Sequence, residues 1–200
     1  RANYLEFWKE FGLVLKEGPA ESFEDKDKIA ELFLFHTSSD HTKLSSLDEY
    51  IESMPSDQEK IFYAVGESLE AVSQSPHIEK LIESGTEVLL LTDRIDEWLM
   101  TSLFSYKEKE FADVAKESIS DEEVKVSKGD SELLERLSKS LKDKVAKVIT
   151  SSRLTKSAVC LVRSKHEPGI QMRRILEAAG QSVPESKPTL EVNAKHKLII

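Results

Sequence analysis

The stretch that decides the fold is residues 60–98, KIFYAVGESLEAVSQSPHIEKLIESGTEVLLLTDRIDEW. Residues 60–65 are rich in aromatic and aliphatic side chains and stop at a glycine, which predicts a strand. Residues 67–82 predict helical structure that is interrupted at Pro76. Residues 87–92 predict a strand, and their continuous apolar centre at 88–91 is typical of a strand buried on both faces. Strand, helix and strand in this order predict a βαβ unit, and therefore an α/β fold.

Helices are predicted before this stretch. Apolar residues stand at helical spacing from the first residues onward, at Tyr4, Leu5, Trp8 and Phe11. They predict a helix without a start signal, so we expect a chain cut from a longer protein. A second stripe at Ile29, Leu32 and Phe33 predicts another helix that runs on toward Phe35. Residues 46–49 (SLDE) match the capping box, in which Ser and Glu side chains satisfy backbone donors, and predict a third helix start.

The remainder of the chain predicts a second region. We expect an edge strand at 109–114 and a polar linker at 116–130. Beyond the linker, the pattern predicts helices over 133–141 and 170–179 and strands at 145–149, 158–162 and 189–192. Residues 151–200 carry nine Lys and Arg against four Glu, whereas the rest of the chain is strongly acidic. Such charge asymmetry favours two domains.

The composition narrows the class of protein. The 200 residues include 28 Lys and Arg against 37 Asp and Glu, a formal net charge of −9. Because nucleic acids and anionic membranes bind proteins largely through basic side chains, we expect no nucleic acid and no membrane as partner. No apolar run approaches the ~20 residues that span a bilayer. The single cysteine, Cys160, excludes an internal disulfide framework and favours a reducing compartment, so we expect a cytoplasmic protein.

Common phosphate-binding motifs are missing from the sequence. The seven glycines include no pair two residues apart, so there is no G-x-G-x-x-G turn, and none precedes the Lys-Ser or Lys-Thr of a P-loop. The nucleophile-elbow pattern is missing as well, and His36 and His41 are spaced off one helical face without a nearby Cys, so we expect no catalytic residue, cofactor or metal in this chain.

One acidic cluster leaves two interpretations open. Asp93, Asp96 and Glu97 follow the second strand of the βαβ unit, where carboxylates often hold metals or substrates in α/β enzymes. Alternatively, Asp93 caps the next helix while Asp96 and Glu97 favour its positive N-terminal end. A small metal-dependent enzyme domain that uses these three carboxylates around Mg²⁺ is therefore the alternative function.

Seven segments carry a family pattern in their order along the chain: 11–18 (FGLVLKEG), 58–63 (QEKIFY), 75–79 (SPHIE), 85–98 (GTEVLLLTDRIDEW), 152–155 (SRLT), 172–184 (MRRILEAAGQSVP) and 190–193 (LEVN). Together they resemble the heat-shock protein 90 chaperone family across nearly the whole chain. The first four are similar to the latter part of its middle domain, and the last three to the start of its C-terminal domain. Trp98 and the GQSVP run resemble the bacterial, HtpG-type branch.

The resemblance implies an ATP-dependent molecular chaperone that works as a homodimer and binds unfolded or partly folded client proteins. In that family the site for ATP and Mg lies in an N-terminal domain. The arginine that reaches the terminal phosphate and the dimerisation helices also lie outside the matched segments. The chain is thus expected to supply client-contacting and coupling surface, while the ATPase resides in the full-length parent.

The resemblance also assigns the domains. Residues 1–115 correspond to the C-terminal part of the middle domain, expected as a small three-layer αβα remainder with the βαβ unit. Residues 116–130 form a linker, and 131–200 correspond to a truncated α+β C-terminal domain without its dimerisation helices.

Two client-binding sites are implied as well, one on the helix after residue 95 and one on the helix at 170–179. Their residues are Glu97, Trp98 and Thr101 in the first site and Met172, Ile175 and Leu176 in the second. A Met-bearing apolar stripe suits promiscuous binding because the thioether side chain adapts its shape. Core packing is the alternative for both sites, since a large aromatic and a helical apolar stripe are often buried.

Overall fold

The computed structural model describes residues 2–22, 24–116, 128–164, 167–181 and 187–199. The chain divides into two compact units. The first comprises the chain up to Ser73 together with Gly85–Asp113, and the second comprises Gln74–Ser84 and the chain from Val114 onward. This division does not test the assignment of chaperone domains to residue ranges, which remains a prediction.

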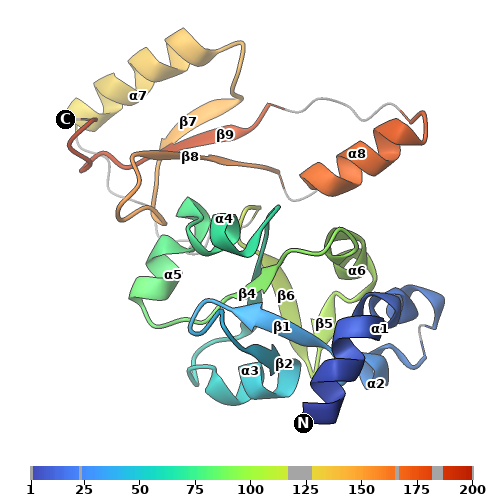
Figure 1. Ribbon diagram of the computed structural model, residues 1–200. Helices are drawn as coiled ribbons and strands as arrows, with labels where there is room; N and C mark the ends of the chain where they lie inside the picture. The colour runs from blue at the N-terminus through green and yellow to red at the C-terminus, as the bar shows by residue number, and fades with distance from the viewer. Residues whose placement is uncertain (1, 23, 117–127, 165–166, 182–186, 200) are drawn as a thin grey trace. The chain divides into compact units, whose positions relative to one another are not determined.

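The first unit is built on a six-stranded mixed sheet in the order β2-β1-β4-β3-β6-β5 (Figure 1). The strands are β1 (Leu34–Thr37), β2 (Leu44–Ser46), β3 (Lys60–Val65), β4 (Leu89–Leu91), β5 (Ser105–Tyr106) and β6 (Lys109–Asp113). Strands β3 and β4 are parallel neighbours, and β3 also pairs in parallel with β6. The predicted βαβ unit and the α/β class are therefore confirmed.

Helices cover both faces of this sheet. They are α1 (Ala2–Glu21), α2 (Lys26–Ala30), α3 (Leu47–Ser53), α4 (Leu69–Ser73) and α6 (Asp96–Ser102). Ile61 of β3 and Leu89 of β4 join one buried cluster with side chains of α1, α3 and α6. Helix α4 lies on the other side of the strands from α3 (Figure 1). There Gly66 permits a close approach, because a Cβ at this position would lie 2.9 Å from Cβ of Val72.

The region before β3 differs in part from the sequence prediction. The stripe around Phe33 was expected to continue as a helix, but α2 ends at Ala30 and the chain becomes strand β1 at Leu34. The capping box is confirmed. The Ser46 hydroxyl accepts from the Glu49 backbone N–H at 3.2 Å, and the Glu49 carboxylate accepts from the Ser46 N–H at 2.9 Å.

The predicted edge strand at 109–114 is not at an edge. It is β6, and it lies between β3 and the two-residue strand β5. A tight hairpin joins β5 to β6 through Lys107 and Glu108, whose φ angles are 45° and 64°. Left-handed φ at both central residues is the geometry that best fits the twist of two strands joined by so short a turn.

The second unit carries a three-stranded sheet in the order β7-β9-β8. Its elements are a 3₁₀ turn η1 (Pro76–Ile78), α5 (Glu79–Glu83), α7 (Lys128–Leu141), β7 (Lys147–Thr150), β8 (Val159–Val162), α8 (Ile170–Ala178) and β9 (Thr189–Val192). Strand β9 pairs in parallel with β7 and antiparallel with β8. Leucines of α7 pack on the cluster formed by Val145, Leu190 and Val192. The predicted linker falls largely on 117–127, which lie outside the described residues.

A carboxylate holds the segment 74–84 within the second unit. Glu79 begins α5, and its side chain accepts hydrogen bonds from the backbone N–H groups of Thr155, Lys156 and Ser157 at 2.8 to 3.1 Å. The Ser157 hydroxyl donates to it as well. We call this arrangement the Glu79 clasp. It joins the SPHIE and SRLT segments, which lie about 75 residues apart in the sequence.

Candidate functional site

Helix α6 presents the first group of predicted client-binding residues. The helix follows the fully buried strand β4, and its own Leu99 is completely buried. Glu97 and Trp98 are partly exposed, and Thr101 is exposed. The Thr101 hydroxyl donates to the Trp98 carbonyl at 2.7 Å, one turn back along the helix. The three predicted residues thus share one helix, and none of them belongs to its buried face.

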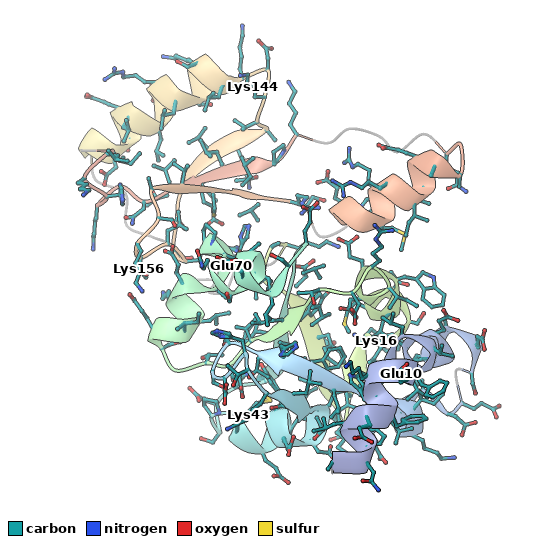
Figure 2. All side chains as sticks on the ribbon, in the orientation of Figure 1. Glu10, Lys16, Lys43, Glu70, Lys144 and Lys156 are labelled. Atoms are coloured by element: carbon teal, nitrogen blue, oxygen red, sulfur yellow. The ribbon has the colours of Figure 1, made fainter. Side chains whose placement is uncertain are left out.

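A buried lysine of α1 reaches the start of this helix. Lys16 Nζ lies 2.7 Å from Oδ2 of Asp93 and 2.7 Å from Oδ1 of Asp96. It also lies 4.9 Å from the ring centre of Phe35 and 5.9 Å from that of Trp8, within the range of a cation–π contact. The Lys16 and Asp96 side chains are 3% and 1% exposed, and that of Asp93 is 44% exposed. We call these three charged residues the Lys16 triad; Lys16 is labelled in Figure 2.

The second oxygen of Asp96 is also engaged. Its Oδ2 accepts from the Asp93 backbone N–H at 2.9 Å. Burial raises the pKa of Asp96 above its ordinary value, and the charge and hydrogen bond of Lys16 oppose this shift without reversing it. The expectation that Asp93 caps the helix is wrong. The helix begins at Asp96, and the residue before it, Ile95, makes no side-chain cap.

The metal-dependent alternative finds no support in this geometry. The ammonium of Lys16 binds both Asp93 and Asp96, so the place of a cation between them is taken by a side chain of the protein. Within the described ranges, no group of three His, Cys, Asp or Glu is arranged to hold a metal ion.

Helix α8 of the second unit carries the other predicted group. Ile175 is 52% exposed, and Met172 and Leu176 are partly exposed. The first turn of the helix is tied down by Arg173, whose Nη2 lies 2.8 Å from Oε1 of the buried Glu167. The predicted residues of this group therefore share a helix in one compact unit, whereas α6 belongs to the other.

Sequence reasoning missed Lys16, although a signal was present. The buried residues of α1 are Trp8, Gly12, Lys16 and Pro19. Lysine at the spacing of an apolar stripe is unusual, because burial of an unpaired ammonium is costly. That spacing predicts a buried acidic partner. The identity of the partner, 77 and 80 residues further along the chain, required the structure.

The thiol of Cys160 makes no chemical contribution to this site. It lies buried on β8, and burial, with a smaller effect from the Glu191 charge, raises its pKa to about 12. Such a thiol stays protonated and unreactive at neutral pH.

No helix in the described part of the chain combines the length and the apolar character that crossing a membrane would require.

Comparison with known proteins identifies the family. The family model described as Hsp90 protein matches residues 1–200. The chain is 44% identical over 209 residues to the chaperone protein HtpG of Shewanella frigidimarina (strain NCIMB 400), and 46% identical over 210 residues to that of Shewanella amazonensis (strain ATCC BAA-1098 / SB2B). Each match covers 98% of this chain and 33% of the relative, so the chain spans about one third of the length of these relatives. From these matches we conclude that the chain belongs to the Hsp90 protein family, in its bacterial HtpG-type branch.

Proposed function

We propose that this chain is a client-contacting part of an HtpG-type molecular chaperone. The observation that carries the proposal is the orientation of α6, which buries Leu99 and leaves Trp98 partly exposed beside Glu97. Tryptophan offers a large apolar face, and the neighbouring carboxylate keeps the edge of that face hydrated. A surface of this kind suits weak, reversible binding of the apolar segments that non-native proteins expose.

Helix α8 supports the same proposal from the second unit. Met172, Ile175 and Leu176 form an apolar stripe that is at least partly exposed. A large contiguous patch of exposed apolar surface usually marks an interaction site. The methionine adapts its shape to different partners, which suits a protein that binds many clients.

The remaining activities of the chaperone belong to the full-length protein in this proposal. The relatives are about three times as long as this chain. We assign the ATPase, with its ATP and Mg²⁺, to a part of that length which this chain does not cover. We propose further that the full-length protein is a homodimer and acts in the cytoplasm.

Client binding by variants of this chain tests the proposal. We expect Trp98→Arg and Leu176→Ser each to weaken binding of a fluorescently labelled, permanently unfolded protein, such as reduced and carboxymethylated α-lactalbumin, measured by anisotropy. Burial of one such side chain against a client contributes on the order of 1.5–3 kcal/mol, so affinity should fall about tenfold or more. The melting temperature should stay within a few degrees.

Matched controls replace exposed apolar side chains elsewhere. Leu32→Arg, between α2 and β1, and Ile82→Ser on α5 remove side chains that are 43% and 44% exposed, and should leave client affinity unchanged. If Trp98 were a core residue, Trp98→Arg would bury an unpaired charge and destabilise the fold by several kcal/mol. Collapse of folding together with lost binding would therefore reject the site on α6.

A further inference from the structure

Helix α6 depends on contacts with the rest of the first unit for both its stability and its orientation. It has seven residues, fewer than two full turns, and isolated helices of this length are unstable in water. Its buried side is anchored by Leu99 and, just beyond its end, by Leu103, both completely buried. Apolar burial holds this side of the helix against the sheet, but it is non-directional and sets the rotation of the helix less sharply than ion pairs and hydrogen bonds do.

Packing leaves room around the start of the helix. A cavity of about 270 Å³ adjoins the Lys16 triad, and its lining includes Trp8, Thr92, Asp93 and Asp96. The turn between β4 and α6 is therefore not enclosed by close-packed side chains on this side.

The Lys16 triad supplies directional contacts at this place. The ammonium of Lys16 binds a carboxylate before the helix and another in its first turn. Asp96 in addition accepts from the Asp93 N–H, so one side chain joins the turn, the helix and α1. Such a buried ion pair adds little net stability over apolar packing, because the desolvation of the charges offsets their attraction, but its contacts depend on direction as apolar contacts do not.

We infer that Lys16 is a positioning residue for the client-contacting helix: through Asp93 and Asp96 it fixes the rotation of α6, which turns Trp98 and Glu97 outward. This inference rests on the proposed function, because Lys16 matters for client binding only if α6 contacts clients. Asp96 and Leu99 occupy the inward side of the helix, and a rotation that released Asp96 would carry Trp98 toward the sheet.

The test separates position from stability. Lys16→Met alone leaves the buried Asp96 without its cationic partner and can destabilise the fold, so the decisive variant is the double substitution Lys16→Met with Asp96→Asn. It removes both buried charges, while the Asn carbonyl oxygen still accepts from the Asp93 N–H. Lys43→Met is the matched control, because Lys43 also pairs with an aspartate, Asp40, but its side chain is 78% exposed. Lys43 is labelled in Figure 2.

Two readouts are needed, both on the whole 200-residue chain. The first is affinity for carboxymethylated α-lactalbumin by anisotropy. The second is ¹⁹F NMR of 5-fluorotryptophan, which gives two signals because the chain has two tryptophans, and Trp98→Phe assigns them. We expect the double variant to melt within a few degrees of the wild type. Its client affinity should fall at least threefold, and its Trp98 signal should shift or broaden. The control should match the wild type in both.

The outcomes distinguish the two proposals. If Trp98→Arg weakens client binding but the double variant keeps wild-type affinity and an unchanged Trp98 signal, the inference about Lys16 is wrong and the proposed function stands. If Trp98→Arg keeps wild-type affinity, the site on α6 is rejected, and the Trp98 signal still decides whether Lys16 sets the rotation of the helix.

A milder variant tests the inference if the double variant does not fold. Asp93→Asn removes one of the two carboxylates at a side chain that is 44% exposed. We expect a shift of the Trp98 signal in the same direction and about a twofold loss of affinity. An unchanged signal and unchanged affinity would overturn the inference.

Discussion

Arg153 is the largest side chain that is completely buried in the described part of the chain. Its Nε lies 3.1 Å from Oε2 of Glu191 on β9, and its Nη1 donates to the carbonyl of Val114. Its own carbonyl accepts from the Lys80 N–H at 3.2 Å. A buried guanidinium is tolerated only with such partners. Arg153 therefore ties together three stretches of the second unit that are distant in sequence.

The charge of Arg153 also acts on a buried histidine. Burial lowers the pKa of His77 to about 4, and the positive charges of Arg153 and Arg163 add to the effect. Its Nδ1 is buried without a hydrogen-bond partner. His77 is thus neutral in the folded chain under conditions where an exposed histidine would begin to bind a proton.

This shift predicts a loss of stability in mild acid. Between pH 6.5 and about 4 the unfolded chain binds a proton at His77 and the folded chain does not, so stability falls as pH falls. The loss should be on the order of 2 kcal/mol at pH 5. Urea unfolding at pH 7 and pH 5 measures it, and His77→Phe should remove that part of the pH dependence. His41→Phe, at an exposed position, should retain it. An equal pH dependence in His77→Phe and the wild type would contradict this account.

At the scale of elements, the Glu79 clasp fastens a short helix to a loop by hydrogen bonds to backbone N–H groups. Burial tends to raise the pKa of Glu79, but the Ser157 hydroxyl and the backbone N–H groups of 155–157 outweigh it and hold the pKa below its ordinary value. A carboxylate with a lowered pKa stabilises the fold above its unfolded pKa and loses this contribution as pH falls through the folded value.

Glu79→Gln should therefore weaken the second unit at neutral pH. We expect a loss of about 1–3 kcal/mol, because the amide has one acceptor oxygen and no charge for the donors of the clasp. Urea unfolding measures the loss, and the difference from the wild type should shrink as the pH falls through the lowered pKa of Glu79. Glu83→Gln, exposed on the same helix, is the control. If both variants unfold like the wild type, the clasp contributes nothing to stability.

The elements that could be predicted from the sequence are those whose conformation depends mainly on their own residues. Strands β3 and β4 were predicted because a central parallel strand needs unbroken apolar runs, as in Leu89–Leu91. The β5–β6 hairpin was missed because Lys107 and Glu108 adopt left-handed φ without the Asn or Gly that usually marks such a turn. Strand β1 was missed because four residues after a short helix can continue the helical pattern.

The same difference between local and long-range information applies to the candidate site. The client-binding residues of α6 were predicted from the family resemblance alone, whereas the residues by themselves left core packing of Trp98 open. The link between α6 and Lys16 was not predicted, because the partners are 77 and 80 residues apart and only the folded sheet brings them together. The linker and much of the loop before β9 lie outside the described residues, so their predictions remain predictions.

At the scale of the whole molecule, we predict that this chain neither binds nor hydrolyses ATP. The sequence has no glycine-rich loop of the kind that cradles phosphates with backbone N–H groups. Isothermal titration of the 200-residue chain with ATP and Mg²⁺ should give only heats of dilution, whereas the full-length chaperone should bind. Stoichiometric binding by this chain would place a nucleotide site among these residues.

The place of segment 74–84 in the sequence restricts which hybrid proteins can be made by joining this chain to a related protein. It lies in the sequence between β3 and β4 of the first unit, yet it belongs to the second unit, where Ile78 and Leu81 are buried. A hybrid gene that joined residues 1–115 to the remaining length of a distant relative would bring Glu79 and these two side chains against a foreign loop. Recombination at the linker would thus separate the clasp from its own donors. Functional hybrids should require that 74–84 be inherited together with the segment after residue 150.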